Sequence, residues 1–463
     1  VKGGDGNTAF MNFRPSSFRD MAGNFNDQFF SIPTTEIPDT RPPEIIGSEL
    51  FYGTGLLFIH FSESIDVTPT DMVNVSGFYI SNETKLGEFG TIHVEGGRVT
   101  TPITDNSTFS ISLTEEQRAQ AVRMSGTPGG DVGSIILDVL AGTVYDLAGN
   151  PNVLFFHVVI VEHEDNVPPL ILSSMLNLST GHLIIQSSET MDTTPTSTDP
   201  LAPLNASRIA LVNSEFNAVA METERTTPGV TNVLINLDGA QYIQCDGHPM
   251  DCDKVYVTIV LTERQRVRAI AMSATPGGDG VGMTLSLLKF AVRDIALNFQ
   301  NTTHNVIVNE TADTIRPNTL SATLNYSNGL LTIFADETVD TTPTSLIHPE
   351  FFSFVNDNNV ATTSSRVQNI NAAQVQISPD GLSFSMILTE YERFRVLEMS
   401  DTPGGDGTPV LLEIATGGYF DIGQNSNEHE TQIIVTEHRD SVHPELITAW
   451  LDLNNGTLRV FFS

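Results

Sequence analysis

Basic residues are scarce in this 463-residue chain. It has 22 Lys and Arg against 56 Asp and Glu, a formal net charge of −34 at pH 7. Binding to a nucleic-acid backbone needs clustered Lys and Arg, so no nucleic-acid partner is expected. The chain also lacks a run of about 20 apolar residues, the length that a membrane helix requires. We therefore expect no membrane span here, and an acidic surface that favours solubility or cation binding.

Cysteine is almost absent too. The two that occur, Cys245 and Cys252, enclose six residues within an insertion found in only one part of the chain. A disulfide that closes a short loop is expected for an exported protein, and two free thiols are the alternative.

Motifs of catalytic sites are missing as well. The chain has no Gly-x-Ser-x-Gly, no His-Glu-x-x-His and no cysteine in a catalytic motif. The glycine-rich stretch 277–282 lacks the Lys-Ser/Thr of a phosphate-binding loop, which favours a turn. Repeated carboxylates could imitate a glycosidase pair, but several equal active sites in one array would be an unusual design. We predict that the chain is not an enzyme.

What the chain does contain is a repeat of domain length. Thr-Pro-Gly-Gly-Asp occurs at 127–131, 275–279 and 402–406. Two acidic motifs keep the same register, one at 62–66, 188–192 and 336–340 and the other at 20–24, 146–150, 294–298 and 421–425. A period this long indicates tandem globular modules, because solenoid repeats are much shorter.

This register divides the chain into five parts: the C-terminal part of a module at 1–39, complete modules at 40–165, 166–313 and 314–440, and the N-terminal part of a module at 441–463. The module at 166–313 carries the cysteine-bearing insertion. The chain begins without Met and without a signal peptide, so we expect neither end to be native.

Each module has mostly β signals and a single helix signal. Short apolar runs such as 56–61, 183–186 and 330–334 follow polar turns that contain Gly, as in hairpins. Capping boxes begin at Thr114, Thr262 and Thr389. The fold class predicted is all-β, with tandem β-sandwich modules that each carry one short helix.

The residues that follow each capping box suggest how the helix packs. Val122 with Met124, and Ile270 with Met272, are expected to close the end of the sandwich. An arginine recurs on all three helices, as Arg118, Arg266 and Arg393. It could form a buried ion pair with a carboxylate, but the sequence favours a solvated helix face.

The motifs resemble those of known Ig-like modules. Phe61 to Asp66, then Leu113, then Asp146 to Asn150 are similar to motifs in the Ig-like modules of bacterial surface-layer and adhesive proteins. The linker 162–169 is acidic and ends in Pro-Pro, and it resembles the linker between cadherin repeats. The resemblance implies tandem Ig-like or cadherin-like β-sandwiches in a surface or adhesive chain without catalytic activity.

Acidic residues near the linkers are the candidate metal ligands. A Glu/Asp pair precedes a proline in every linker: Glu36/Asp39, Glu162/Asp165, Glu310/Asp313 and Glu437/Asp440. Calcium takes six to eight oxygen ligands, so a linker pair would need help from the two acidic motifs. The cadherin resemblance implies three sets: Glu63, Asp146 and Asp165; Glu189, Asp294 and Asp313; and Glu337, Asp421 and Asp440.

A purely structural role competes with calcium at these positions. Asp146 could cap a turn through its own backbone, with Asn150 ending the turn and Glu63 solvated at a strand end. The Asp-x-Asp spacing of strong calcium sites is absent from these linkers and acidic motifs, and this favours the structural role. Calcium at the module junctions remains the only cofactor predicted.

Asn-x-Ser/Thr sequons are numerous, which is typical of an exported glycoprotein. They begin at Asn74, Asn82, Asn106, Asn177, Asn205, Asn301, Asn309, Asn325 and Asn455. Asn177 and Asn325 occupy the same turn in their modules, so we expect that turn to project from the sheet and to carry glycans.

These features together predict an extracellular or cell-surface structural protein that is glycosylated and self-associates. It would be the repeating subunit of a filament, fibril, sheath or flagellar hair, because repeated identical faces favour open assembly. The alternative is a calcium-dependent adhesin or receptor ectodomain that binds carbohydrate or another cell. A third possibility, accessory modules of an enzyme, requires a catalytic domain outside this sequence.

Overall fold

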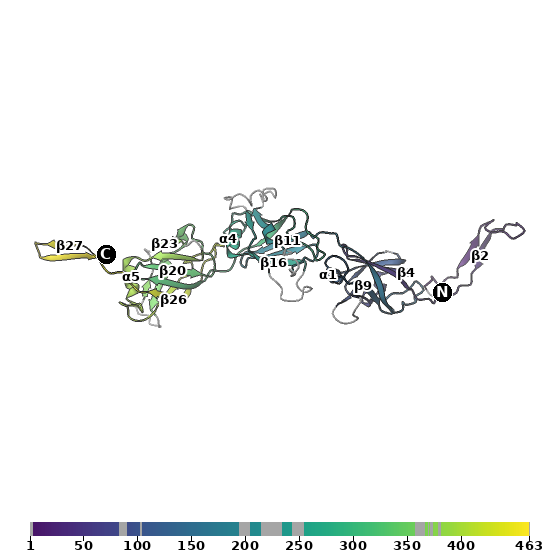
Figure 1. The fold of residues 1–463 in the computed structure, drawn as a ribbon, viewed down its shortest axis with the longest axis horizontal. Coiled ribbons are helices and arrows are strands. Elements are labelled where there is room, and N and C mark those ends of the chain that lie inside the picture. Colours follow the sequence, from purple (N-terminus) through teal and green to yellow (C-terminus); the bar gives the residue numbers. More distant parts are fainter. Residues whose placement is uncertain are drawn as a thin grey trace.

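The computed structural model describes residues 3–82, 90–101, 104–193, 204–213, 234–242, 254–356, 366–368, 370, 374–377 and 381–462. Three modules lie in a row along an extended rod, and a β-hairpin lies at each end (Figure 1). The hairpins are β1 (Phe10–Phe13) with β2 (Phe29–Pro33), and β27 (Leu446–Asp452) with β28 (Thr457–Phe462). Cys245 and Cys252 lie outside the described residues, and so does the disulfide predicted for them.

The described residues of the first module form eight strands: β3 (Ile45–Phe51), β4 (Leu56–Ile65), β5 (Phe78–Asn82), β6 (Thr91–His93), β7 (Arg98–Thr101), β8 (Asn106–Ser112), β9 (Ile135–Val139) and β10 (Phe155–His163). They hydrogen-bond in the order β6-β5-β9-β10-β3-β4-β8-β7. Strand β3 pairs antiparallel with β4 and parallel with the last strand, β10. One sheet therefore carries the first, second, fifth and sixth strands and the other carries the rest, which is the Ig-like arrangement.

The other two modules repeat this strand order. The second contains β11 (Ile171–Asn177), β12 (His182–Ser187), β13 (Ile209–Asn213), β14 (Leu234–Asn236), β15 (Gln241–Tyr242), β16 (Tyr256–Val260), β17 (Met283–Leu287) and β18 (His304–Thr311). The third contains β19 (Thr319–Asn325), β20 (Leu330–Ala335), β21 (Phe352–Asn356), β22 (Arg366–Gln368), β23 (Gln374–Ile377), β24 (Ser383–Ile387), β25 (Val410–Ile414) and β26 (Glu430–His438). The predicted all-β class of tandem Ig-like sandwiches is confirmed.

Each module has its own apolar core between the sheets. Along β4, Leu57, Ile59 and Phe61 are buried while the side chains between them are more exposed. This alternation follows from the two-residue period of a strand. Ile295 and Ala296 of the second module also belong to the core of the first, so apolar packing continues from one module to the next.

Among the described residues, one α-helix per module lies between the sixth and seventh strands: α1 (Glu115–Arg123), α4 (Glu263–Ala271) and α5 (Glu390–Leu397). Single 3₁₀ turns lie at η1 (Thr70–Met72), η2 (Val75–Gly77), η3 (Ala206–Arg208), η4 (Thr344–Leu346) and η5 (Pro349–Phe351). No helix of the described residues has the length and apolarity needed to cross a membrane.

The helices begin where the sequence predicts. Thr114 Oγ1 accepts a hydrogen bond from Gln117 N at 3.3 Å, and Gln117 Oε1 accepts one from Thr114 N at 2.8 Å. Thr262 and Thr389 form the same reciprocal cap. Val122 and Met124 are buried in the core, which confirms that the helix closes one end of the sandwich.

Candidate functional site

The junctions between modules bring together most of the residues that recur in the sequence. In the second junction, Arg266 projects from α4 and donates to both carboxylate oxygens of Glu263, at 2.7 and 2.9 Å. It also donates to Leu178 O at 3.1 Å in its own module, and to Asp313 Oδ2 of the linker at 2.6 Å. A fifth bond, at 2.9 Å, reaches Glu337 Oε2 of the following module. All five guanidinium donors are therefore satisfied.

The first junction repeats this geometry. Arg118 donates to Glu115, to Tyr52 O, to Asp165 Oδ2 at 2.8 Å and to Glu189 Oε2 at 3.0 Å. The residue is only 5% exposed. The interpretation of this arginine as part of a solvated helix face is therefore wrong. The helix lies at the end of its module, where the next module covers it.

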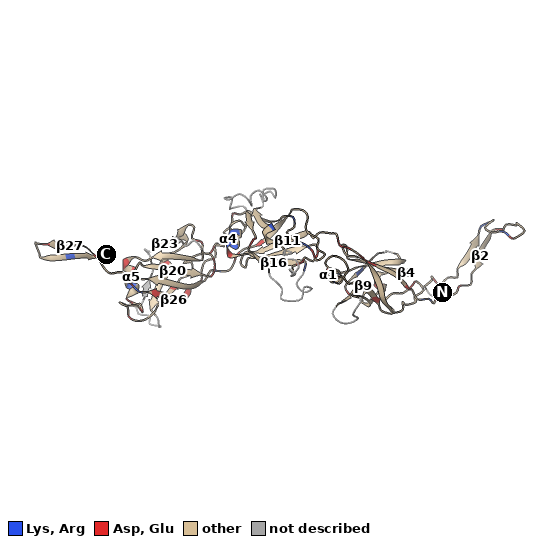
Figure 2. Ribbon diagram, viewed as in Figure 1, with Lys and Arg blue, Asp and Glu red and all other residues tan. Residues whose placement is uncertain are grey.

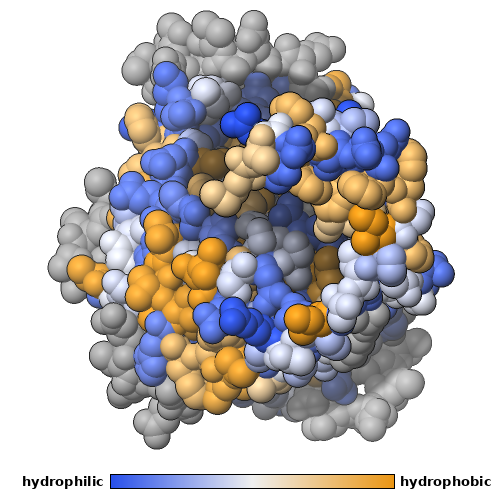
Figure 3. All heavy atoms as spheres, turned by 90° about the vertical axis from the view of Figure 1, so that its right-hand side faces the viewer, coloured by the Kyte–Doolittle hydropathy of each residue, from blue (hydrophilic) through white to orange (hydrophobic). Residues whose placement is uncertain are grey.

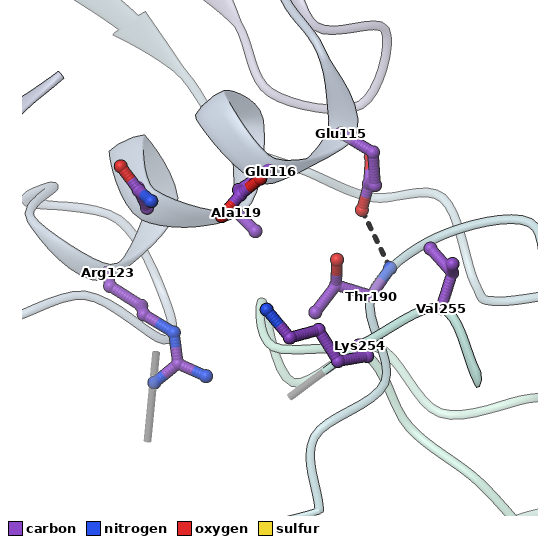
Figure 4. Close-up of a pocket in the computed structure, with 8 residues that line it drawn as sticks. Glu115, Glu116, Ala119, Arg123, Thr190, Lys254 and Val255 are labelled. Carbon is purple, nitrogen blue, oxygen red and sulfur yellow. Dashed lines mark hydrogen bonds between the residues drawn. The ribbon is translucent and has the colours of Figure 1, made fainter. Parts of the chain in front are cut away.

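A second contact joins each helix to the following module. Glu115 Oε1 accepts a hydrogen bond from Thr190 N at 2.7 Å, drawn as the dashed line in Figure 4. Glu263 Oε1 does the same for Thr338 N at 3.1 Å. A pocket of about 210 Å³ lies beside this contact, between α1 and the second module. Lys254 of the second module is among the residues that line the pocket (Figure 4). The helix carboxylate thus binds the arginine and the neighbouring backbone together.

The Thr-Pro-Gly-Gly loop supplies a close backbone contact at each junction. Gly277 has φ +84°, and a Cβ there would lie 2.0 Å from Ile422 O of the next module. Gly129 stands in the same relation to Ile295 O, at 2.0 Å, and Gly3 to Leu147 O, at 1.9 Å. Only glycine combines this left-handed conformation with such a close approach. The recurring loop therefore packs directly on the module that follows.

The Asp-x-x-x-Asn loop of the following module contacts the linker that precedes it. Asp294 accepts from Asn298 N at 2.8 Å and from Asn298 Nδ2 at 3.0 Å, and Asn298 Nδ2 also donates to Asp165 O at 3.0 Å. Asn425 makes the matching bonds to Asp421 and to Asp313 O. The turn-capping role predicted for this aspartate is confirmed, and its asparagine partner additionally holds the linker.

The carboxylates gather into three clusters, in each of which one oxygen per residue lies within 4.8 Å of the others. The clusters are Asp39, Glu63 and Asp146; Asp165, Glu189 and Asp294; and Asp313, Glu337 and Asp421. The last two are buried throughout, whereas in the first Asp39 is exposed and only Asp146 is fully buried.

The predicted grouping of these residues is wrong by one linker. It placed Asp165 with Glu63 and Asp146, Asp313 with Glu189 and Asp294, and Asp440 with Glu337 and Asp421. In the structure each linker aspartate meets the motifs of the module that follows it. The loops after the second and seventh strands lie at the N-terminal end of the sandwich, so they face the preceding linker. Asp440 instead lies 3.6 Å from Arg393.

The linker glutamates take no part in these clusters. Glu310 accepts hydrogen bonds from Ala274 N at 2.8 Å and from Met283 N at 2.6 Å, both within its own module. Glu162 and Glu437 bind equivalent backbone groups. The Glu/Asp pair of each linker is therefore divided: the glutamate ties down the end of one module and the aspartate enters the junction.

Burial changes the acidity of the clustered carboxyls. It raises the pKa of Glu189 to about 8 against the opposing attraction of Arg118, and it raises the pKa of Glu337 to about 7 against that of Arg266. Burial likewise raises the pKa of Asp294 and of Asp421 to about 6. Each junction therefore disfavours the full negative charge that its carboxylates would carry.

Basic side chains are sparse along the rod, and several of them lie on α4 and α5 (Figure 2). In the second junction the guanidinium of Arg266 faces four carboxylates: Glu263, Asp313, Glu337 and Asp421. The arginine therefore offsets one negative charge, and the local balance stays negative.

The sequon asparagines have varied surroundings. Asn74, Asn106, Asn301, Asn309 and Asn455 are exposed, and Asn82, Asn177, Asn205 and Asn325 are half-buried. The turn after Asn177 does not stand clear of the module: Ser179 Oγ accepts from Thr314 N of the linker at 2.9 Å. Ser327 Oγ accepts from Ser441 N at 3.0 Å after Asn325. The expectation that this turn projects freely is wrong, because it packs at the junction.

Asn82 has a bond that recurs in every module. Its Nδ2 donates to Asp131 of the Thr-Pro-Gly-Gly-Asp loop at 3.0 Å, as Asn213 Nδ2 does to Asp279 and Asn356 Nδ2 does to Asp406. Neither Asn213 nor Asn356 begins a sequon. This position therefore has a structural role in holding the junction loop, whichever residues follow it.

Comparisons with known proteins find no matching family model and no matching curated protein. Among solved structures, the N-terminal part of the bacterial S-layer protein SbsC is 10% identical with a TM-score of 0.19, over 48% of this chain and 44% of that chain. The chain thus spans less than half of that protein fragment.

Two further solved structures show similarity of the same low degree. The titin domains z1z2, solved in complex with telethonin, are 11% identical with a TM-score of 0.14, over 59% of this chain and 98% of that one. The N-terminal four Ig domains of Dscam1 isoform 6.44 are 11% identical with a TM-score of 0.14, over 86% and 78%. These scores place the chain in no family, and the Ig-like assignment rests on the strand order.

Proposed function

We propose that this chain is a stiff extracellular structural strand, the repeating part of a cell-surface filament, fibril, sheath or flagellar hair. The observation that carries the proposal is the junction: the same arginine, glycine and asparagine contacts join the first module to the second and the second to the third. The role proposed for the chain is purely structural.

The junction contacts support stiffness. Domains within a chain move relative to one another unless their interface is extensive and well packed. Here the linkers 164–170 and 312–318 are short. Bending at either linker would break the hydrogen bonds of the arginine, the backbone contact of the glycine and the apolar packing between the modules at the same time. Ile295 illustrates that patch, being only 4% exposed and part of the preceding core. Modules would then set the length of the strand and junctions its rigidity.

Repeated apolar side chains at equivalent positions of the modules support lateral self-association. A β-bulge interrupts the first strand of each module and of the C-terminal hairpin. In the three modules the residue at the bulge is large, apolar and more than half exposed: Ile46 69%, Leu172 52% and Leu320 68%. Bulges are known to redirect side chains in this way.

The neighbouring last strand adds a second exposed apolar residue at equivalent positions, Val159 at 63%, Ile307 at 81% and Ile434 at 72%. The parallel pairing of β11 with β18 places Ile307 beside the bulged Leu172. Viewed along the rod from its N-terminal hairpin, hydrophobic residues form separate patches among hydrophilic ones (Figure 3). A spacing repeated in every module suits contacts between like chains.

The extracellular and glycosylated parts of the proposal rest on the sequence. Nine sequons and an acidic composition are typical of exported glycoproteins. Five of the sequon asparagines are exposed and would accept a glycan without disturbing a junction. Such glycans would also separate acidic rods that otherwise repel one another.

The test is electron microscopy of the native material, combined with sedimentation of the purified chain. We expect filaments with an axial repeat of one module, and we expect the triple variant Leu172→Ser, Leu320→Ser, Ile434→Ser to sediment as single rods with unchanged thermal stability. Because these side chains are exposed, folding should not depend on them. Single rods from the unaltered chain under all conditions would contradict the filament proposal.

The alternative is a calcium-dependent adhesin or receptor ectodomain, and the buried carboxylate clusters favour it. An adhesin would concentrate partner binding in one terminal module, whereas a filament strand would make contacts along its whole length. Cross-linking of the native assembly distinguishes the two patterns.

A further inference from the structure

The second junction contains more negative charge than its protein partners neutralise. Glu337 and Asp421 come from the third module and Asp313 from the linker, and Arg266 is the one basic side chain paired with any of them within 4.0 Å among the described residues. Arg266 also holds Glu263. Several buried carboxylates this close together repel one another strongly unless a further positive charge is present.

One oxygen of the cluster has no protein partner. Glu337 is 8% exposed, and its Oε2 accepts from Arg266. Its Oε1 is buried and has no hydrogen-bond partner. Because Oε2 already accepts from the arginine, Oε1 is the oxygen that can still take a further ligand. A buried polar atom without a partner is costly and rare in folded proteins, so this oxygen indicates a missing ligand.

The other two carboxylates are held ready. Asp421 is fixed by Asn425, whose N and Nδ2 donate to its two oxygens at 2.8 and 2.9 Å. Asp313 is fixed by Arg266 on one oxygen and by Ile315 N, at 3.0 Å, on the other. Each oxygen can accept more than one bond, so these bonds orient the carboxylates without preventing coordination.

From this geometry we infer that Asp313, Glu337 and Asp421 bind one divalent cation, and that Asp165, Glu189 and Asp294 bind another. Carboxylate oxygens are ligands for hard cations. Calcium lies about 2.4 Å from its oxygen ligands, so two of its ligands can be up to about 4.8 Å apart, and the oxygens of each cluster lie within that limit of one another. Magnesium, with ligands at about 2.1 Å, would require a tighter set.

Such an ion would join parts that come from different modules. The linker aspartate and the two carboxylates of the following module would share it, while the arginine of the preceding module binds two of the same residues. Three carboxylates leave several positions for water, which corresponds to a weak site. We expect a dissociation constant on the order of 0.1–1 mM, the range of extracellular calcium modules. The inference does not depend on filament assembly.

Calcium binding to the full chain at pH 7.5 tests the inference, measured by isothermal titration calorimetry alongside hydrogen exchange of the linkers 164–170 and 312–318. We expect Ca²⁺ to bind and to slow exchange at both linkers, and Mg²⁺ at the same concentration to do so less. The variant Glu337→Gln should lose the calcium effect at 312–318 and keep it at 164–170. Glu398→Gln, whose carboxylate is 46% exposed at the C-cap of α5, is the matched control and should keep both.

Three outcomes would overturn the inference: no calcium effect on either linker, an unchanged effect in Glu337→Gln, or equal loss in Glu398→Gln. If exchange at the linkers slows at pH 5 but calcium has no effect at pH 7.5, then protonation of the carboxylates, and not a cation, relieves their repulsion. Circular dichroism shows whether Glu337→Gln is folded. If it is not, Asp421→Asn is measured in its place with the same criteria. A rod that binds calcium but never forms filaments would disprove the proposed function and leave this inference intact.

Discussion

Arg266 and Arg393 occupy the same position on α4 and α5, but a complete module covers only Arg266. Both bond the carbonyl of a hairpin in their own module, Leu178 O and Tyr326 O, and both pair with a glutamate three residues earlier on the helix. The side chain of Arg266 is 7% exposed and that of Arg393 is 23% exposed. Each module therefore forms half of the arginine site by itself, and the next module completes it.

The linker aspartates show how the following module changes the arginine site. Asp313 lies 2.6 Å from Arg266 with a fully buried side chain, whereas Asp440 lies 3.6 Å from Arg393 and is 32% exposed. The glycines of the adjacent loop differ in the same way. A Cβ on Gly277 would meet Ile422 O at 2.0 Å, but on Gly404 the nearest atom is Leu397 Cδ2 at 3.8 Å. Within this sequence a complete module follows the loop of Gly277, whereas only the hairpin β27–β28 follows the loop of Gly404.

The largest expected effect comes from removing the covered arginine. Arg266→Ala leaves buried carboxylates without their cation, and breaking a buried ion pair in this way costs about 3–5 kcal/mol. Arg393→Ala removes a more exposed pair and should cost about 1 kcal/mol or less. Hydrogen exchange of the amides in 312–318, compared with those in 439–445, measures the free energy of opening at each place. Equal effects of the two substitutions would mean that the following module does not strengthen the arginine site.

Alanine at the covered glycine should have a smaller but still unequal effect. Gly277 and Gly404 both have positive φ, +84° and +106°, and an alanine in a left-handed conformation costs about 1–2 kcal/mol. At Gly277 the new Cβ would also displace the backbone of the next module, which adds about 1–3 kcal/mol. Scanning calorimetry of both variants gives the difference. If Gly404→Ala is as destabilising as Gly277→Ala, the loop contact is not what constrains the glycine.

The smallest expected effect is the loss of a helix cap, and it should be equal in α4 and α5. Thr262 and Thr389 cap α4 and α5 with bonds that stay within their own modules. Substituting either by Ala should cost about 1 kcal/mol, with no dependence on whether the helix is covered. Calorimetry of the two variants checks this. A markedly greater loss for Thr262→Ala would mean that the cap is coupled to the junction.

Much of the fold could be predicted from local patterns. The capping boxes predicted the start of each α-helix among the described residues, because the two reciprocal bonds of a cap join residues only three apart. Strand-length apolar runs between Gly-containing turns identified the sheets, because a strand buries alternate residues. The turn-capping role of Asp146 is also local, since its partner Asn150 lies four residues away.

The junction could be predicted only in part, since its partners are distant. Arg118 meets Glu189, 71 residues later, and nothing beside Arg118 in the sequence reports that another module covers it. One signal was available: the arginine recurs together with a glutamate three residues earlier on all three helices. Strand direction was another. The second strand returns to the N-terminal end of the module, so the loop after it faces the preceding linker.

Small-angle X-ray scattering of the full chain with 2 mM calcium tests most directly whether the junctions are rigid. We predict a profile that a single extended conformer fits, with the maximum dimension of the rod in Figure 1. We also predict that Arg118→Ala combined with Arg266→Ala shortens that dimension and requires a mixture of bent conformers. If the unaltered chain already requires such a mixture, the junctions are flexible linkers and the account is wrong.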